Sequence, residues 1–177
     1  MLKGLNAIVT GSTSGIGLGI ANVLASKGAN LVINGFGDAA AIEAERANLE
    51  AKYGVKVVYS GADISKPSDV KAMVELCVSS FGSVDILVNN AGIQYTESVE
   101  NFPAERWDAI IAINLSGIFH AIQAALPHMK AKGFGRIINI ASVHGLIGST
   151  HKVAYVAAKH GVVGMSKVVA LETAGTG

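Results

Sequence analysis

Tyr155 and Lys159, four residues apart, are the pair in this sequence best suited to proton transfer. Residues at this spacing share one face of a helix, so the lysine ammonium would lie beside the tyrosine phenol. A free phenol has a pKa of about 10, and a neighbouring cation lowers it by favouring the phenolate. Ser142 stands upstream and can donate a hydrogen bond to a substrate oxygen. This chemistry suits hydride transfer between an alcohol and a carbonyl, although the spacing alone is common and needs support from the rest of the chain.

The first apolar run of the chain is followed directly by a glycine-rich turn, Thr10–Gly17 (T-G-S-T-S-G-I-G). Glycines in such a turn let backbone N–H groups approach a pyrophosphate, and the start of the next helix adds partial positive charge. Because a strand precedes this turn and a helix follows it, we interpret it as a nucleotide-binding turn rather than a simple loop. The residues expected to contact the cofactor here are Gly11, Thr13, Gly15, Ile16 and Gly17.

The segment after the second apolar run, Asn34–Asp38, is where an acidic residue would normally bind the adenosine ribose. Phe36 occupies the expected position and can pack beside the ribose and adenine. Asp38 comes one or two residues late, so it either binds the ribose or only caps the following helix. Neither this segment nor Ser12–Gly17 contains an Arg or Lys to receive the 2′-phosphate of NADP. The missing cation predicts NAD as the cofactor.

Polar segments also follow the third and fourth apolar runs. Each segment alone would suit an ordinary turn. Open α/β sheets bind ligands at the carboxyl ends of their strands, however, and these segments follow successive strands. The candidate cofactor contacts in them are Asp63, Ile64, Asn90, Ala91 and Gly92.

The elements that must position these residues alternate between short apolar strands and longer helical patterns. The expected strands are Ala7–Val9, Leu31–Ile33, Val55–Tyr59, Ile86–Val88 and Ile137–Ile140. The expected helices are Ile16–Lys27, Ala39–Tyr53, Ser68–Phe81, Pro103–Met129 and Val153–Ala174, with left-handed caps at Gly28, Gly54, Gly82 and Gly133. Pro127 is expected to bend or end the fourth helix. The alternation predicts an α/β fold: a Rossmann-like, doubly wound parallel sheet forming a single NAD-binding domain over residues 1–177.

Taken together, the motifs resemble the short-chain dehydrogenase/reductase family. The resemblance depends on T-G-x-x-x-G-x-G at 10–17, N-N-A-G at 89–92, Ser142 and Y-x-x-x-K at 155–159, and it covers essentially the whole chain. It implies that Tyr155 and Lys159 also contact the cofactor and that Asn114 joins a water-mediated proton relay. Family members continue into two more strands and a substrate lid. We therefore expect either that the protein continues beyond residue 177 or that this chain alone is a weak enzyme.

Three polar residues stand close in sequence to the predicted catalytic groups. Gln94 lies two residues after the N-N-A-G segment, and His144 lies two residues after Ser142. Lys152 lies three residues before Tyr155. Singly each suits a solvated surface residue, but together a carboxamide, an imidazole and a cation suit a small carboxylate substrate.

The three residues also resemble those of family members that act on small 3-hydroxy acids. That resemblance implies NAD-linked interconversion of (R)-3-hydroxybutyrate and acetoacetate, with Ser142 and Tyr155 also touching the substrate. It further implies a homotetramer paired through the two long helices. Two alternatives remain open: a related carbonyl reductase acting on 3-oxoacyl thioesters, which would usually use NADPH, and a catalytically silent protein that binds a nucleotide without oxidising an alcohol.

Composition narrows the remaining classes of function. Half of the 177 residues are apolar and 15% are charged, so a large core is available and disorder is not expected. The net charge of +1 provides no electrostatic footprint for nucleic acid or an anionic membrane. Cys77 is the only cysteine, so neither an intrachain disulfide nor a cysteine metal site is expected. The start of the chain lacks a signal peptide and no uninterrupted apolar run approaches about 20 residues, so we expect a soluble, cytoplasmic protein.

Overall fold

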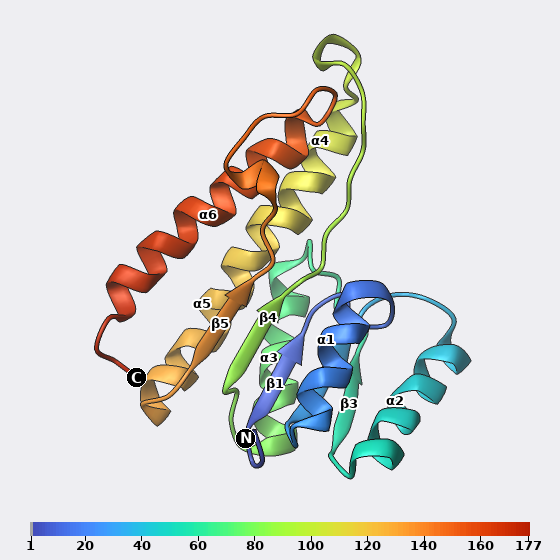
Figure 1. Ribbon diagram of the computed structural model, residues 1–177, viewed down its shortest axis with the longest axis vertical. Coiled ribbons are helices and arrows are strands. Elements are labelled where there is room, and N and C mark those ends of the chain that lie inside the picture. The colour runs from blue at the N-terminus through green and yellow to red at the C-terminus, as the bar shows by residue number, and fades with distance from the viewer. Residues whose placement is uncertain (1) are drawn as a thin grey trace.

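Five short strands form one parallel sheet in the order β3-β2-β1-β4-β5. The computed structural model describes residues 2–177 (Figure 1). Between β1 and β4 the strand order reverses, which creates the crevice where doubly wound sheets bind ligands. The strands are β1 Asn6–Val9, β2 Asn30–Asn34, β3 Val57–Ser60, β4 Ile86–Asn89 and β5 Arg136–Asn139.

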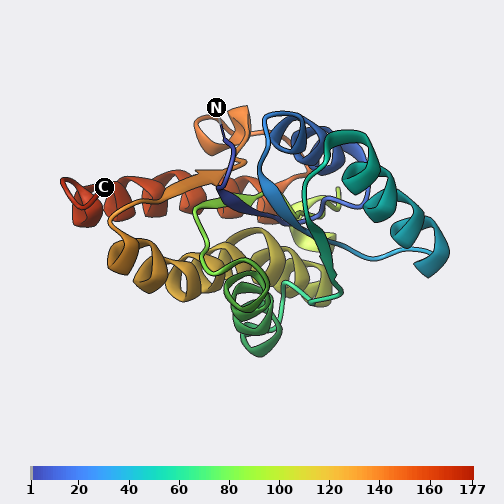
Figure 2. The same cartoon turned by 90° about the horizontal axis from the view of Figure 1, so that it is seen from below.

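Helices cover both faces of this sheet (Figure 2). On one face, α1 and α2 pack against a core that includes Val9, Leu31 and Leu49. On the other face, α3, α5 and α6 share a core that includes Leu87 and Ile118. Strands β1, β2 and β4 are nearly continuous in apolar residues, as expected for strands with both faces buried. The α-helices are α1 Gly15–Ser26, α2 Ala39–Tyr53, α3 Pro67–Phe81, α4 Ala104–Ile111, α5 Gly117–Lys132 and α6 Val153–Thr173.

A π-helical turn, η2 Ala112–Ser116, joins α4 to α5 in one continuous helix. Among the described residues, this helix alone is long and apolar enough to cross a membrane by length and composition. Its α5 part instead packs against α3 and β4 and buries Ile118, Ile122 and Met129, as a core helix of an α/β domain does. Of the two predicted effects of Pro127, ending the helix is wrong, because α5 continues to Lys132, and bending the helix stays a prediction. Pro127 and Gln123 are both exposed, so the carbonyl that the proline leaves unpaired lies on the solvent side.

The predicted fold class is confirmed, and most predicted ends lie within one residue of the observed ones. The exceptions are β3, which begins two residues later than expected, and the helix containing Pro127. Gly54, Gly82 and Gly133 cap α2, α3 and α5 with φ of 67°, 89° and 68°. Gly28, just beyond the end of α1, has φ 94°. Two short 3-10 turns complete the fold, η1 Val99–Asn101 and η3 Val143–Gly145.

Candidate active site

The turn after β1 packs directly on the segment after β4. Nδ2 of Asn90 donates hydrogen bonds to the carbonyl oxygens of Thr10, at 3.0 Å, and Gly11, at 3.1 Å. A Cβ on Gly11 would lie 2.9 Å from Cα of Ala91, and a Cβ on Gly17 would overlap the Gly11 carbonyl. Side chains at 11 and 17 are therefore excluded by close packing, and the backbone of the turn stays open to a ligand.

Asn34, at the end of β2, joins the carboxyl ends of three strands. Its Oδ1 accepts a hydrogen bond from the Gly11 N–H at 3.2 Å. Its Nδ2 donates to the carbonyl oxygens of Ser60, at 3.0 Å, and Ala62, at 2.9 Å. Asn34 is almost completely buried. Sequence reasoning missed this role, although an asparagine directly after an apolar strand core was the available signal.

A cavity of about 290 Å³ opens at these strand ends. The structure brings most of the predicted cofactor residues together in its lining: Gly11, Thr13, Phe36, Asp63, Ile64, Asn90, Ala91 and Gly92. Gly15, Ile16 and Gly17 lie at the start of α1, outside that lining. The lining residues that sequence reasoning missed are Ser14, Asn34, Gly35, Ala62, Ile93 and Ile113.

The charged side chains at this cavity are acidic rather than basic. No residue of its lining, within the described part of the chain, is a lysine or arginine. Hydrogen bonds from Ser65, aided by Lys66, hold the pKa of the Asp63 carboxyl below its usual value, so Asp63 is a carboxylate at neutral pH. Asp38 caps α2, since its Oδ1 accepts from the Ala41 N–H at 2.9 Å. Of the two interpretations of Asp38, the structure supports the helix cap.

Lys159 is buried beneath Tyr155 on α6. Only 4% of Lys159 is exposed, and its Nζ lies 5.6 Å from the centre of the Tyr155 ring. The ammonium donates a 2.5 Å hydrogen bond to the Ile140 carbonyl at the end of β5. Burial lowers the pKa of Lys159, because desolvation disfavours the ammonium. The predicted Tyr–Lys pair is thus present at the carboxyl end of the sheet.

The 3-10 turn η3 brings Ser142 and His144 to this pair. The Ser142 Oγ accepts a hydrogen bond from the His144 N–H at 3.2 Å, which leaves the hydroxyl proton free for a ligand. The His144 ring lies edge-on to the Tyr155 ring, with 6.3 Å between the centroids. Nδ1 of His144 is buried and has no hydrogen-bond partner among the residues that the structure describes. A buried polar atom left unpaired is unusual in folded proteins.

Asn114 lies in the π-helical turn and is completely buried. Its Oδ1 accepts from the Ile93 N–H, and its Nδ2 donates to the Ile93 carbonyl, both at 2.8 Å. π-Helical turns are frequent at functional sites. Through these two bonds Asn114 holds the segment that precedes Gln94. Gln94 itself is exposed. The proton relay through Asn114 stays a prediction.

The two segments that carry the outer substrate candidates are joined to each other. The Glu97 N–H donates to the His151 carbonyl at 2.9 Å, which links the segment of Gln94 to the residue before Lys152. His151 has φ 60°, a left-handed conformation, and Lys152 is the N-cap residue of α6. Gln94 and Lys152 therefore lie on segments that this bond joins, and His144 lies on η3, which packs against α6. Their substrate roles stay predictions.

Thiol chemistry has no support in this structure. Burial raises the pKa of the Cys77 thiol to about 12, so the thiol stays protonated at neutral pH. Within residues 2–177, no group of three His, Cys, Asp or Glu side chains is placed to hold a metal ion. The catalytic roles of the tyrosine, the lysine and the serine stay predictions.

A cavity at the switch point of a parallel sheet, together with a Tyr–Lys pair at the carboxyl end of the same sheet, is typical of a dinucleotide-dependent oxidoreductase. The chain belongs to the short chain dehydrogenase family, whose sequence profile matches residues 5–177. This family implies a nicotinamide cofactor. The glycine turn fits such a group, because positions 11 and 17 have no room for a Cβ where the backbone must face a pyrophosphate.

Several proteins are similar over nearly the whole chain. D-beta-hydroxybutyrate dehydrogenase of Cupriavidus necator is 61% identical over 177 residues, which are all of this chain and 68% of that protein. The enzyme of the same name from Rhizobium meliloti is 54% identical over 97% of this chain and 66% of its own length. The 3-oxoacyl-(acyl-carrier-protein) reductase of Staphylococcus aureus is 41% identical over 97% of this chain and 70% of that protein. A crystal structure described as a short-chain alcohol dehydrogenase of Sinorhizobium meliloti is 32% identical and superposes with a TM-score of 0.93, covering 99% of this chain and 69% of that one. The chain thus spans about two thirds of the length of its relatives.

Proposed function

We propose that the protein is an NAD-dependent dehydrogenase that interconverts (R)-3-hydroxybutyrate and acetoacetate. The two most similar relatives named above support this substrate by their names. The observation that carries the proposal is the His144 ring beside the Tyr155 ring, with 6.3 Å between the centroids. The imidazole can donate a hydrogen bond to a carboxylate or carbonyl oxygen of a small substrate held next to Tyr155.

The proposed reaction uses the residues at the start of α6. In alcohol oxidation, the Tyr155 phenolate removes the hydroxyl proton, and the nearby Lys159 ammonium stabilises that phenolate. Ser142 donates a hydrogen bond to the substrate oxygen and orients it. Gln94, His144 and Lys152 bind the carboxylate of the substrate. When bound, the nicotinamide supplies the hydride acceptor.

The preference for NAD over NADP is part of this proposal. Its support is the cavity lining without a lysine or arginine, with Phe36 at its rim, 69% exposed. The Phe36 carbonyl accepts from the Thr13 hydroxyl at 3.3 Å, and the Gly35 carbonyl accepts from the Tyr59 hydroxyl at 2.8 Å. These bonds hold the rim in a conformation that offers an aromatic face to a ribose but no positive charge to a 2′-phosphate.

We further infer that copies of the chain pair through α5 and α6 into a cytoplasmic homotetramer. Large apolar side chains are exposed on these helices: Phe119 at 47%, Val168 at 53% and Leu171 at 80%. A helix that is apolar on its outer face needs a second surface to cover it. Light scattering on the purified protein tests this, and a monomer at about 50 μM would contradict it.

The catalytic proposal is tested first by steady-state assays of (R)-3-hydroxybutyrate with NAD, and of an acetoacetyl thioester with NADPH. Oxidation of hydroxybutyrate supports the proposal. Turnover of the thioester alone would assign the reductase activity instead, and NAD binding without oxidation would mean a silent nucleotide-binding protein.

The role of His144 is tested by His144→Leu, which should raise KM for hydroxybutyrate about 10- to 100-fold and leave the Kd of NAD within about twofold. His160→Leu is the matched control, because His160 is exposed on α6 and contacts its own helix at Val156. Equal KM values for the two variants would remove His144 from the substrate site.

A further inference from the structure

The outer edge of β3 is bonded to two charged side chains of α2, the helix that runs beside it (Figure 1). β3 is the last strand on its side of the sheet, so no strand lies next to its outer edge. The Lys56 carbonyl accepts from the Leu31 N–H of β2 at 2.9 Å, so the backbone groups of the next residue, Val57, point away from β2. The Val57 N–H donates to Oε1 of Glu50 at 2.9 Å, and Nη1 of Arg46 donates to the Val57 carbonyl at 2.9 Å. Both outward groups of Val57 are therefore occupied by side chains.

The two side chains also hold each other. Nη1 of Arg46 lies 2.7 Å from Oε2 of Glu50, one helical turn farther along α2, and the two side chains are 21% and 37% exposed. The hydrogen bond from Val57 and the pairing with Arg46 lower the pKa of the Glu50 carboxyl, so it is a carboxylate at neutral pH. The guanidinium and the carboxylate thus supply one donor and one acceptor where a residue of a neighbouring strand would supply them.

Without this pair, the edge would be open to another strand. Residues 55–59 have the sequence V-K-V-V-Y, which is rich in β-branched and aromatic side chains, contains one charge and lacks proline. Segments of this kind pair readily with copies of themselves. β3 spans four residues, so Tyr59 is the only other residue of the strand with outward-facing backbone groups. Closing Val57 therefore leaves an added strand a single residue to bond.

We propose that the Arg46–Glu50 pair blocks strand addition at the edge of β3, and that the partner it excludes is the same strand of a second copy of the chain. Two copies related by a twofold axis would pair antiparallel along this edge. β3 and β5 form opposite edges of the sheet, so this surface is separate from the pairing through α5 and α6. The inference does not depend on the proposed catalytic activity.

The same helix provides a matched control in Glu43. Oε1 of Glu43 lies 2.7 Å from Nη2 of Arg46, and the Glu43 side chain is 62% exposed. Among the described residues, Glu43 makes no hydrogen bond to β3. Glu43→Leu and Glu50→Leu therefore each remove one carboxylate from Arg46, and only the second frees the Val57 N–H. Glu50→Gln keeps an oxygen that can accept from Val57.

The experiment measures binding of a fluorescently labelled peptide with the sequence of residues 55–60, V-K-V-V-Y-S, by fluorescence anisotropy at a temperature where every variant is folded. Glu50→Leu and Arg46→Met should bind this peptide at least about 10-fold more tightly than the parent protein, because an outward group of Val57 is then open in each. Glu43→Leu and Glu50→Gln should bind it as weakly as the parent. A peptide with proline at its third position cannot pair fully and should bind no variant.

Hydrogen exchange followed by NMR locates the contact. The Val57 amide should exchange about 10-fold faster in Glu50→Leu than in the parent protein, and should slow again when the peptide is bound. The Leu31 amide, which is bonded inside the sheet, is the reference and should not change. Faster exchange at Val57 without peptide binding would show that the pair only attaches α2 to the sheet, and would overturn the inference. Equal peptide binding by Glu43→Leu and Glu50→Leu would overturn it as well.

Discussion

The nucleotide-binding half and the catalytic half of this site are built differently. Around the nucleotide cavity, Asn34 and Asn90 pair backbone groups of several strand ends before any ligand arrives. Around the catalytic tyrosine, polar groups stay incomplete: Nδ1 of His144 is unpaired, and the Lys159 ammonium is buried with one carbonyl partner. The polar groups of the first half are hydrogen-bonded to one another and hold the backbone in place. In the second half, not all polar groups have a hydrogen-bond partner among the described residues. Mutations should therefore affect the two halves in opposite ways.

The largest effect is expected from Tyr155→Phe in the catalytic half. Loss of the hydroxyl removes the proton carrier and should lower kcat about 1000-fold, while the Kd of NAD changes by less than about threefold. Steady-state kinetics and calorimetric titration with NAD measure the two quantities. Undiminished hydride transfer would leave the catalytic half without its central group.

The next effect is expected from Asn34→Leu in the nucleotide half. The change leaves the carbonyls of Ser60 and Ala62 and the Gly11 N–H without this partner, and should lower the free energy of unfolding by about 3 kcal/mol. Urea denaturation measures it. Asn48→Leu is the control, since Asn48 is exposed on α2 and makes only a 3.5 Å bond to Glu45. Similar losses in both variants would mean that Asn34 does not organise the cavity.

A smaller effect is expected where the two substrate segments meet. His151 is exposed and left-handed, with φ 60°, so a β-branched residue there is strained. His151→Val should lower the free energy of unfolding by about 1.5 kcal/mol, whereas His151→Asn, which tolerates this conformation, should stay within about 0.5 kcal/mol. Thermal denaturation compares the two. Equal stabilities would show that the turn relaxes when the side chain changes.

The smallest expected effect is a change in the free energy of unfolding with pH, caused by the buried Lys159. Burial lowers the folded-state pKa of Lys159 below its unfolded value of about 10.4. Below the folded pKa the protein bears the full cost of the buried ammonium, and that cost disappears as pH rises through the interval between the two values. The stability of Lys159→Met relative to the parent protein should therefore be higher at pH 7 than at pH 10, and activity should be lost. Urea denaturation at both pH values measures this, and a gain that grows with pH would contradict it.

Much of the fold could be predicted because its signals are local. Apolar runs of four or five residues set the strands, and glycines such as Gly54 and Gly82 mark helix ends that need positive φ. The chemistry-bearing residues were equally visible, since Tyr155 and Lys159 lie on one helix and the cofactor segments follow successive strands. Their chemical roles are untested by the structure alone.

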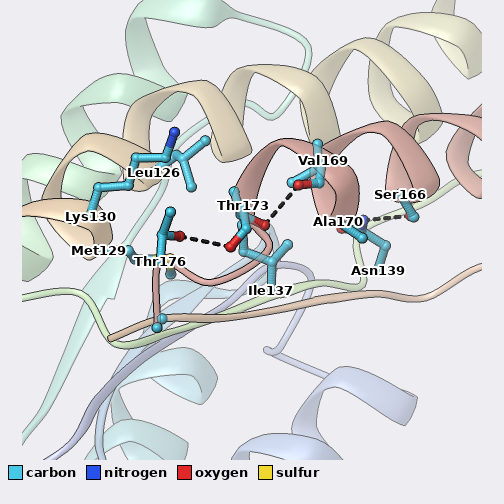
Figure 3. Close-up of a pocket in the computed structure, with 12 residues that line it drawn as sticks. Leu126, Met129, Lys130, Ile137, Asn139, Ser166, Val169, Ala170, Thr173 and Thr176 are labelled. Atoms are coloured by element: carbon cyan, nitrogen blue, oxygen red, sulfur yellow. Dashed lines mark hydrogen bonds between the residues drawn. The ribbon is translucent and has the colours of Figure 1, made fainter. Parts of the chain in front are cut away.

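The features that sequence reasoning missed depend on contacts between distant segments. In the sequence, Asn34 resembles an ordinary residue at the end of a strand. Its role becomes visible only in the structure, where β1 and β3 lie beside it. In the sequence, Pro127 indicates a helix end. In the structure Pro127 is exposed, so the backbone hydrogen bond that it cannot make lies on the solvent side of the helix. The hydrogen bond between Asn139 and Ser166 (Figure 3) joins residues that are 27 positions apart, and no periodic pattern in the sequence indicates it.

The π-helical turn at Ala112–Ser116 has a consequence for how this family can vary. An α-helix advances about 100° per residue, so a turn with one extra residue shifts the phase of α4 relative to α5 by roughly that angle. Deleting one residue there would regularise the helix yet swing the Asn114 amide away from the strand-end segment it holds. Length changes within this helix are thus constrained by angle rather than by reach.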